Sequence, residues 1–488
     1  MTIYIKNHDF KYEIENLCRV FFQNEKLVVT EDLSTQGNSE NYVYTEQKLV
    51  DGNIIMSVEI NIDGNKVTKE QEVPHEEESE CERILAVILF EVLSEITGVR
   101  PPWGILTGVR PIKLMRRLVN SDGEEKATKY FKDSLLVSDK KTKFSLATMR
   151  AEQKILDLSE NKSYSLYVSI PFCPTRCSYC SFVSQSVEKS AKLIPQYVDL
   201  LCKELEYTAQ IAKNLGLKLE TVYIGGGTPT TLSAEQLSQL IEAINNNFDM
   251  SSCREFTVEA GRPDTITPEK LRAIKNGGVT RISINPQTLN DDILSLIGRK
   301  HSSRQTIDAF NLARECGFDN INMDLIAGLP SESYESFVDT LTRINELGPE
   351  SITIHTLAMK RSSGLTAQGK NFFAEDSKRT SDMLDFATEL LYKNKYEPYY
   401  LYRQSRMVGN LENVGWAKKG YEGLYNVYIM DETHSILACG AGAVTKLKSP
   451  NSDYIERIFN FKFPYEYIAQ FEEMIERKKQ VSLFYDEL

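Results

Sequence analysis

Three cysteines lie close together in the stretch YVSIPFCPTRCSYCSF: Cys173, Cys177 and Cys180, with the spacing C-x3-C-x2-C. Cysteine thiolates at such short spacings bind iron–sulfur clusters. A cluster of four irons held by three cysteines leaves one iron free to bind another molecule. The spacing therefore predicts a [4Fe–4S] reaction centre, since a closed zinc site would need four ligands. The three cysteines could also be grouped by chance, or could bind zinc together with a distant residue.

The remaining six cysteines lie singly along the chain, without the spacing of a disulfide framework. They are Cys18, Cys81, Cys202, Cys253, Cys316 and Cys439. Isolated cysteines are typical of a reducing compartment. The longest apolar run in the N-terminal third, residues 84–90, is far shorter than the roughly 20 residues that span a bilayer. No basic and apolar leader opens the sequence, so we expect a cytoplasmic protein without a membrane span.

The charge of the chain bears on its partners. The sequence has 57 Lys and Arg residues against 69 Asp and Glu residues, which gives a net charge of −12. A field of this sign repels nucleic acids and anionic membranes, so we expect neither as a partner. An anionic substrate would need a locally basic pocket.

The length of 488 residues exceeds the size of a single hydrophobic core, so we expect two or three domains. Residues 1–75 have the pattern of strands, with hairpin turns at Asp51-Gly52 and Asp63-Gly64. A helix is predicted over residues 82–96, and helical patterning continues with breaks to about residue 159. The segment TGVRP occurs twice in between, at 97–101 and at 107–111. Residues 1–159 are therefore predicted to form an N-terminal α+β module.

Short β-rich runs alternate with amphipathic helical stretches over residues 160–360. The six predicted strands are residues 166–172, 221–227, 256–261, 281–287, 320–328 and 351–358. Repeated strand–helix–strand units form right-handed crossovers and a parallel sheet. Six units are too few for the closed eight-stranded barrel, so we predict an α/β fold with a partial (βα)6 barrel. Its active site should lie at the carboxyl ends of the strands.

The last part of the chain, residues 361–488, is less regular. We predict a C-terminal α+β domain that covers the substrate, with a helix over residues 377–394 and a strand over residues 425–430. A glycine-rich stretch, ACGAGAV, follows at residues 438–444.

Polar and glycine residues follow the predicted strands where an active site is expected. GGGTPT, residues 225–230, follows the second strand, and three successive glycines suit a close approach of backbone to ligand. Glu259 ends the third strand, Gln287 ends the fourth and Asp324 lies on the fifth. Each feature taken singly could be a flexible turn, a cap or a surface residue, but all of them occur at the predicted site.

The cysteine loop closely resembles that of radical S-adenosylmethionine (SAM) enzymes, in which SAM binds the open iron and is cleaved to a radical that abstracts hydrogen from the substrate. GGGTPT matches the segment that holds the SAM amino group in this family. The resemblance implies that residues of the loop and of this segment bind SAM. These residues are Tyr167, Phe172, Tyr179, Gly226, Gly227 and Thr228. Tyr167 also matches a tyrosine that contacts the substrate, and is the implied catalytic residue.

The strand-end residues recur in the same order in the oxygen-independent coproporphyrinogen III oxidases. By this resemblance, Glu259 and Arg299 would contact the amino and carboxylate groups of SAM. Gln287 and Asp324 would reach the ribose hydroxyls, and Ile326 would contact the adenine through its backbone. The TGVRP pair and the run NLENVGWAKKG resemble the HemZ-type branch of this family.

The family resemblance implies an oxidoreductase of haem biosynthesis. Its reaction is the oxidative decarboxylation of two propionates of coproporphyrinogen III, which yields protoporphyrinogen IX. The implied partners are this tetrapyrrole substrate and an external electron donor of the flavodoxin or ferredoxin kind. Some arginines are expected to bind the propionates collectively. The basic candidates are Arg100, Arg110, Lys113, Arg116, Arg117, Lys360, Arg361, Arg403 and Arg406.

Two positions depart from the founding oxidases, which have a histidine at Ser169 and a fourth cysteine at Phe182. Haem chaperones of the same superfamily also have phenylalanine at the second position, which makes a chaperone the alternative function. Their haem-binding motif has a histidine before an asparagine, however, and the nearest equivalent here is Gly409-Asn410. Among the five histidines, His355 stands at a strand end that faces the predicted site. A radical SAM enzyme acting on another tetrapyrrole or heteroaromatic is a third possibility.

Overall fold

The computed structural model describes residues 1–23, 25–32, 41–73, 77–180, 184–358, 374–404 and 407–486. Contacts between residues divide the chain into two compact units. The N-terminal unit comprises residues 1–149, 370–381 and 402–412, and the barrel unit comprises residues 150–369, 382–401 and 413–488. The three domains predicted from the sequence stay a prediction.

The sheet of the N-terminal unit has five strands in the order β2-β1-β3-β4-β5. They are β1 (Thr2–Lys6), β2 (Val28–Thr30), β3 (Tyr42–Val50), β4 (Asn53–Ile62) and β5 (Asn65–Glu72). Two-residue turns at Asp51-Gly52 and Asp63-Gly64 connect the last three strands. All four turn residues have positive φ angles, as hairpin turns of this length require. Both predicted hairpins are therefore confirmed.

One helix of this unit was missed by the strand prediction for residues 1–75. Residues Lys11–Phe21 form α1, which buries Ile14, Leu17 and Cys18 in the core beside the sheet. These three residues are spaced three and four apart, which is a helical period. The helix has only 11 residues, so the pattern is too short to stand out from the strands around it. The later helices agree with the predicted pattern. They are α2 (Glu78–Thr97), α3 (Pro111–Asp122), α4 (Glu124–Lys129), the π-helix η2 (Tyr130–Ser134) and α5 (Asp139–Leu156).

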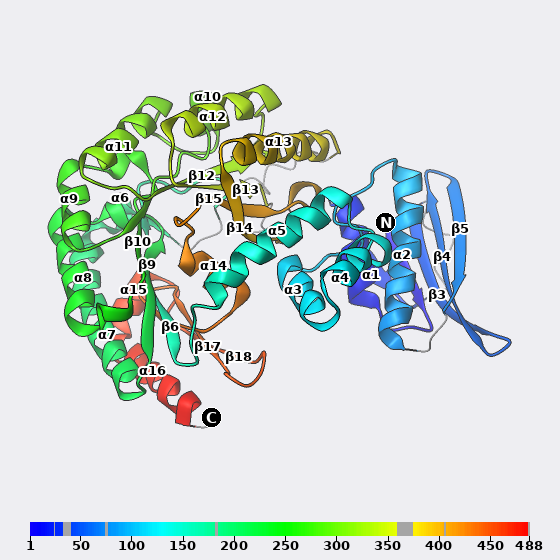
Figure 1. Cartoon of the computed structure of the whole chain (residues 1–488), viewed down its shortest axis with the longest axis horizontal. Helices are drawn as coiled ribbons and strands as arrows, with labels where there is room; N and C mark the ends of the chain where they lie inside the picture. The colour runs from blue at the N-terminus through cyan, green and yellow to red at the C-terminus, as the bar shows by residue number, and fades with distance from the viewer. Residues whose placement is uncertain are drawn as a thin grey trace. The chain divides into compact units, whose positions relative to one another are not determined.

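Six parallel strands form the centre of the barrel unit, in the order in which they occur along the chain. They are β6 (Ser163–Ile170), β9 (Lys218–Gly226), β10 (Glu255–Glu259), β11 (Arg281–Ser283), β12 (Ile321–Ala327) and β13 (Ser351–Thr356). Figure 1 shows the connecting helices along the outside of these strands. They are α7 (Ile194–Asn214), α8 (Ala234–Asn247), α9 (Pro268–Asn276), α10 (Asp291–Leu296), α11 (Ser303–Glu315) and α12 (Tyr334–Leu347). The predicted α/β fold with a partial (βα)6 barrel is confirmed.

Strands from the C-terminal part extend this sheet at both edges to eleven strands. At one edge β16 (Ser435–Cys439) runs parallel to β6, and β17 (Val444–Lys448) and β18 (Ile455–Phe459) follow as antiparallel strands. At the other edge β15 (Asn413–Lys418) pairs antiparallel with β13, and β14 (Tyr396–Tyr402) lies beyond it. The helices of this part are α13 (Ala374–Lys393), α14 (Leu424–Asp431), α15 (Pro464–Ala469) and α16 (Phe471–Asp486).

The strand predicted over residues 425–430 is wrong, because this segment lies within α14. A short apolar run does not distinguish a strand from a buried helix by its period. What decides the conformation is Glu255 at the start of β10. Its carboxylate accepts hydrogen bonds from the backbone N–H of Leu424, at 2.6 Å, and of Tyr425, at 3.4 Å. A negative charge on these N–H groups stabilises the beginning of a helix.

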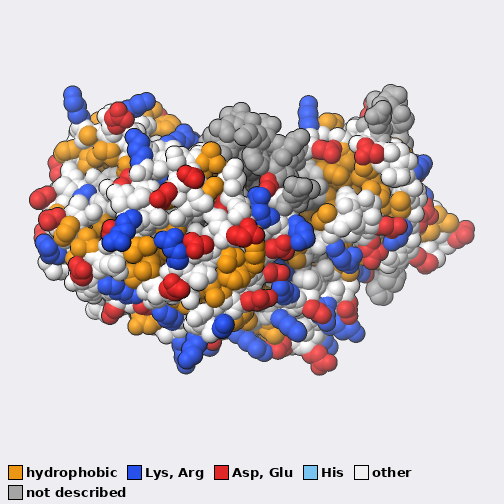
Figure 2. All heavy atoms as spheres, turned by 90° about the horizontal axis from the view of Figure 1, so that it is seen from above, with side chains coloured by type: hydrophobic (Ala, Val, Ile, Leu, Met, Phe, Trp, Pro, Cys, Tyr) orange, Lys and Arg blue, Asp and Glu red, His pale blue; other side chains and the backbone are white. Residues whose placement is uncertain are grey.

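No helix in the described part of the chain is long and apolar enough to cross a membrane. Figure 2 shows Lys and Arg side chains interspersed with Asp and Glu side chains over the visible face. That face therefore carries no extended area of a single charge.

Candidate functional site

The three cysteines lie on the segment that leaves the carboxyl end of β6. Phe172 and Cys173 form the short strand β7, and we refer to residues 173–180 as the cluster loop. All three cysteine side chains are partly exposed thiols. No three His, Cys, Asp or Glu side chains among the described residues already form a group that could hold a metal ion. Three thiols within eight residues are nevertheless the donor set that an iron–sulfur cluster requires.

The cluster loop is attached to the turn that follows α10. The backbone N–H of Ser178 donates to the carbonyl of Ile297, and the hydroxyl of Thr175 donates to the carbonyl of Gly298, both at 3.0 Å. This attachment brings Arg299 to the loop. Burial alone would lower the pKa of Arg299, but its interactions with Tyr179 and Cys177 raise it above its ordinary value. The buried guanidinium therefore stays charged beside the cluster loop.

The glycine segment after β9 packs against both the cluster loop and Glu259. A Cβ atom on Gly227 would lie 2.5 Å from the carbonyl oxygen of Phe172 and 3.0 Å from the sulfur of Cys173. A Cβ atom on Gly225 would lie 3.0 Å from a carboxylate oxygen of Glu259. Thr228 donates to the sulfur of Cys173 at 3.6 Å. The glycines are thus required for close packing, and the segment is more than a flexible turn.

Glu259, at the end of β10, has one hydroxyl partner, Tyr223 on the neighbouring strand. The Tyr223 hydroxyl donates to Oε1 of Glu259 at 2.6 Å. Burial raises the pKa of Glu259 to about 7, and the negative charge of Asp324 acts in the same direction. The hydrogen bond from Tyr223 opposes this shift because it stabilises the charged form. A positively charged ligand beside Glu259 would therefore stabilise its ionised form.

Tyr167, the predicted catalytic residue, belongs to a group of three stacked tyrosines inside the barrel. Its ring is 6.3 Å from that of Tyr223 and 6.2 Å from that of Tyr425, and the latter two rings are 4.5 Å apart. Burial raises the pKa of Tyr167 above its ordinary value, so the phenol is neutral at physiological pH. Tyr425 comes from α14 and was not predicted as a site residue, since the sequence there indicated a strand.

Gln287 and Asp324 are adjacent at the ends of their strands. The backbone N–H of Gln287 donates to the carbonyl of Asp324 at 2.9 Å, and the N–H of Ile326 donates to the carbonyl of Gln287 at 3.0 Å. Gln287 has a φ angle of 70°, which is strained for a residue with a side chain. Its buried Oε1 has no hydrogen-bond partner among the described residues. Strain and a free buried acceptor together indicate a position that a ligand completes.

The carboxylate of Asp324 is held by two side chains. Asn322 donates to its Oδ1 at 2.7 Å, and Nε2 of His355 lies 3.8 Å from its Oδ2. Burial acts to raise the pKa of Asp324, but the bonds from His355 and Asn322 outweigh it and hold the pKa below its ordinary value. Asp324 is therefore an ionised acceptor, and His355 lies at the site as the sequence indicated.

Ser169, where the founding oxidases have histidine, is buried in a tightly packed position. Its hydroxyl donates to the carbonyl of Ala441 at 2.9 Å. A Cβ atom on Gly226 would lie 3.0 Å from this hydroxyl, and one on Gly440 would lie 2.5 Å from the Ser169 carbonyl. The Ser169 side chain thus lies between Gly226 and the glycine-rich turn after β16, and its hydroxyl is hydrogen-bonded to that turn. Phe182, the other departure, lies outside the described residues.

The basic residues proposed for the substrate are only partly accounted for. Arg403 belongs to the N-terminal unit, where its guanidinium donates to the carbonyls of Leu106, at 2.7 Å, and Asn410, at 3.0 Å. Its backbone N–H also donates to the carbonyl of Val109 at 2.8 Å, so this arginine is bonded to the second TGVRP segment. Lys360, Arg361 and Arg406 lie outside the described residues.

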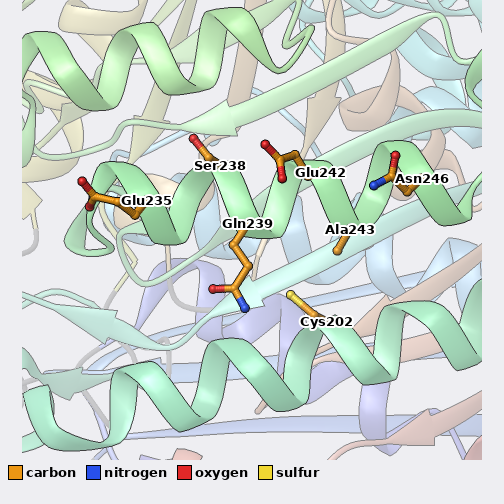
Figure 3. Close-up of a pocket in the computed structure, with 7 residues that line it drawn as sticks. All are labelled: Cys202, Glu235, Ser238, Gln239, Glu242, Ala243 and Asn246. Carbon is orange, nitrogen blue, oxygen red and sulfur yellow. The ribbon is translucent and has the colours of Figure 1, made fainter.

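A shallow hollow lies between α7 and α8 (Figure 3). None of the candidate site residues lines it. Its lining is Cys202, Glu235, Ser238, Gln239, Glu242, Ala243 and Asn246. Burial raises the pKa of Cys202 to about 11, so its thiol is protonated. Gln239 donates to Asp199 at 2.9 Å. The hollow lies on the helices outside the sheet and away from the carboxyl ends of the strands, where active sites of parallel sheets occur.

Comparison with known proteins agrees with the arrangement of the site. Residues 167–344 match the radical SAM superfamily. The chain is 38% identical over 398 residues to the oxygen-independent coproporphyrinogen-III oxidase-like protein HemZ of Bacillus subtilis (strain 168). The aligned region covers 81% of this chain and 79% of that protein. The chain belongs to this family of radical SAM proteins.

Two further proteins of the superfamily are also similar to this chain. It is 32% identical over 311 residues to the heme chaperone HemW of Bacillus subtilis (strain 168), with 62% of this chain and 77% of that protein covered. The solved structure of coproporphyrinogen III oxidase (HemN) from Escherichia coli aligns with a TM-score of 0.52 and 24% identity, over 67% of this chain and 73% of that one. The latter likeness shows the shared fold.

Radical SAM proteins use a [4Fe–4S] cluster and SAM as cofactors. The residues of this chain fit both groups. The cluster loop provides three thiols for the iron–sulfur cluster. Near the carboxyl ends of the strands, the carboxylate of Glu259, the amide oxygen of Gln287 and the charged guanidinium of Arg299 are polar groups that suit SAM.

Proposed function

We propose that this protein is a tetrapyrrole-directed radical SAM oxidoreductase that converts coproporphyrinogen III to protoporphyrinogen IX. The observation that carries the proposal is the convergence of Glu259, Arg299 and the glycine segment on the cluster loop. This convergence occurs in a chain whose HemZ relative is named as coproporphyrinogen-III oxidase-like. In the reaction each of two propionates loses carbon dioxide, a hydrogen atom and an electron and becomes a vinyl group. A reductant must supply the electron that initiates each turnover, and an acceptor must take the electron released.

The cysteines of the cluster loop, Cys173, Cys177 and Cys180, would hold the cluster. With the cluster reduced and SAM bound, the two cofactors together supply hydrogen-atom abstraction. The protein's own part is to bind and orient SAM. Glu259 would accept hydrogen bonds from the SAM ammonium group, a charge-assisted contact.

Other residues would complete the SAM site. Arg299 would pair with the SAM carboxylate, Gln287 and Asp324 would accept hydrogen bonds from the ribose hydroxyls, and Ile326 would contact the adenine. The remaining contacts would come from Tyr167, Phe172, Tyr179, Gly226, Gly227 and Thr228. Tyr167 lies within the barrel beside Tyr223, where it would contact both SAM and the tetrapyrrole.

Anaerobic assay of the reconstituted protein tests this function. Incubation with SAM, a flavodoxin or chemical reductant and coproporphyrinogen III should release carbon dioxide and 5′-deoxyadenosine and form protoporphyrinogen IX. Cys177→Ala should abolish the visible absorption of the cluster and SAM cleavage together. A Cys177→Ala protein that keeps both would contradict the cluster assignment.

A haem chaperone is the second candidate, and the specific observation in its favour is the 32% identity to HemW over 77% of that protein. A chaperone would bind haem tightly and leave coproporphyrinogen III unchanged. Titration of the same reconstituted protein with haem, beside the turnover assay, separates the two functions.

A further inference from the structure

A second arginine, Arg262, contacts the cluster loop from the side of β10. It lies three residues after Glu259, in the loop between β10 and α9, and is 3% exposed. Its Nη1 donates to the hydroxyl of Thr175 at 3.0 Å. Thr175 lies between the first two cysteines of the loop and passes a hydrogen bond on to the carbonyl of Gly298 at 3.0 Å. One hydroxyl thus connects the middle of the cluster loop to two different loops of the barrel.

The guanidinium of Arg262 is itself held in a fixed orientation. Nε and Nη2 donate to the two carboxylate oxygens of Asp264, at 2.9 and 2.8 Å. A two-bonded pair of this kind leaves the guanidinium plane little freedom. The third nitrogen, Nη1, is therefore held in position to donate to Thr175. Through this bond the Arg262–Asp264 pair helps to hold the cluster loop in place.

The charge of Arg262 lies close to the cluster loop, because its guanidinium contacts Thr175, two residues after Cys173. His301, whose Nδ1 lies 4.0 Å from Oδ1 of Asp264, adds no second positive charge there. Burial, together with the charges of Arg299 and Arg262, lowers the pKa of His301 to about 3. The buried cations beside the cluster loop thus include Arg262 and Arg299, and the first of them is paired with Asp264.

We propose that Arg262, oriented by Asp264, is a positioning residue that anchors the cluster loop through Thr175 and makes the bound cluster easier to reduce. The inference rests on the proposed function, because it takes the three cysteines as the cluster ligands. Its physical basis is that the potential of an iron–sulfur cluster depends on nearby charge and on the hydrogen bonds around it. A buried cation stabilises the more negative, reduced state of the cluster.

Two pairs of variants separate the anchor from the charge. Thr175→Val removes both hydrogen bonds of the hydroxyl and leaves the Arg262–Asp264 pair intact, whereas Thr175→Ser keeps the hydroxyl. Arg262→Gln removes the positive charge, whereas Arg262→Lys keeps the charge and loses the two-bonded contact with Asp264. Arg314→Gln is the matched control, because Arg314 pairs with Glu350 at 2.8 Å elsewhere in the barrel unit.

The measurements are made anaerobically on full-length, reconstituted protein. Iron retention during incubation with a chelator reports the anchor, and the midpoint potential of the cluster reports the charge. We expect Thr175→Val to lose iron several times faster than wild type and Thr175→Ser to match wild type. Arg262→Gln should shift the potential to more negative values, and Arg262→Lys should restore most of the shift. Arg314→Gln should change neither quantity.

The proposal is overturned if Thr175→Val and Arg262→Gln retain iron and potential as Arg314→Gln does. Equal potentials for the Gln and Lys variants of Arg262 would overturn the electrostatic part. Failure of the proposed function would look different, since wild-type protein would then bind a cluster but leave coproporphyrinogen III unchanged. If the cysteines were not the ligands, wild-type protein would bind no cluster, or Cys177→Ala would still bind one.

Discussion

Strand β10 carries a glutamate at each end, and the two have opposite surroundings. Glu255, at the start, accepts hydrogen bonds from two backbone N–H groups of α14 and from the hydroxyl of Thr257, at 3.0 Å. Glu259, at the end, has the Tyr223 hydroxyl as its side-chain partner, and its pKa is raised to about 7. The two residues are four positions apart on the same face of one strand. The difference therefore comes from what the rest of the barrel brings to each end.

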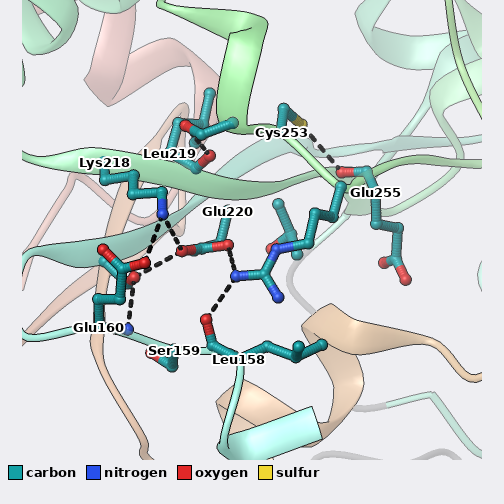
Figure 4. A network of polar contacts seen from close by, with 12 residues as sticks. Leu158, Ser159, Glu160, Lys218, Leu219, Glu220, Cys253 and Glu255 are labelled. Atoms are coloured by element: carbon teal, nitrogen blue, oxygen red, sulfur yellow. Dashed lines mark hydrogen bonds and ion pairs between the residues drawn. The ribbon is translucent and has the colours of Figure 1, made fainter.

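A similar contrast holds at some of the neighbouring strands, although Nε of Arg281, at the start of β11, and Oδ1 of Asn320, just before β12, also lack a partner among the described residues. At the amino ends, Glu220 is fully buried, accepts a hydrogen bond from Ser163 at 2.6 Å and forms an ion pair with Arg254. Lys218 forms an ion pair with Glu160 at 2.8 Å (Figure 4). At the carboxyl ends, buried polar atoms of Ser178, Gln287, Arg299 and His301 have no hydrogen-bond partner among the described residues. Satisfied groups contribute to folding, and unsatisfied ones indicate where ligands bind.

The largest effect is expected at the amino end. Glu220→Ala leaves Arg254 without its carboxylate partner and removes the acceptor of Ser163, so the free energy of unfolding should fall by about 3 kcal/mol. Chemical denaturation of the variant and wild type measures this change. The SAM affinity of the folded variant should equal that of wild type, and a tenfold loss would break the distinction between the two ends.

Glu259→Gln should have the opposite result. If the Glu259 carboxylate pairs with the SAM ammonium group as proposed, its loss should weaken SAM binding by roughly 10- to 100-fold, as expected for a charge-assisted hydrogen bond. Equilibrium binding to the reconstituted protein at pH 8 measures it. A loss of affinity of less than threefold would contradict the assignment.

Glu259→Gln should also remove a pH dependence of stability. The folded-state pKa of Glu259 is raised from its ordinary value of 4.5 to about 7, so the folded state binds the proton more tightly than the unfolded state. Its contribution to stability is therefore fully present below pH 4.5 and is lost as the pH rises to about 7. At pH 8 the free energy of unfolding of the variant should exceed that of wild type, by about 3 kcal/mol at most. Denaturation at pH 5 and pH 8 tests the sign.

Tyr223→Phe sharpens the comparison without removing the carboxylate. The hydroxyl holds the pKa of Glu259 down, so its loss should raise that pKa further. SAM affinity should then increase with pH along a curve whose midpoint lies above that of wild type, with the affinity at high pH unchanged. Titrations between pH 6 and 9 would detect the shift. Coincident curves would mean that Tyr223 only packs against Glu259.

The smallest effect is expected for Gln287→Gly. Glycine adopts the φ angle of 70° without strain, and the substitution also removes the buried amide oxygen without a partner. The free energy of unfolding should therefore rise by about 1 kcal/mol, while SAM affinity falls severalfold. Gln287→Asn, which tolerates this backbone conformation and keeps an amide, is the control. A destabilised Gln287→Gly would show that the amide has a structural partner.

Local patterns were sufficient for much of the fold. The Asp-Gly turns at 51–52 and 63–64 and the six alternating strands each depend on residues close together in the sequence. Such signals act over one turn or one strand, so they survive in any tertiary context. The cysteine spacing and the order of the strand-end residues were likewise readable, because the parallel topology places successive strand ends at one edge.

The sequence by itself therefore determined the α/β class, the barrel, the radical SAM family and the candidate cofactors. Only the tertiary structure decided that residues 425–430 are helical, that Tyr425 stacks on Tyr223 and that Arg262 reaches the cluster loop. The reason is distance along the chain. The carboxylate that begins α14 is 169 residues away from it, and Arg262 and its partner Thr175 are separated by 87. No local period encodes contacts of that range, which exist only once the barrel has brought its strand ends together.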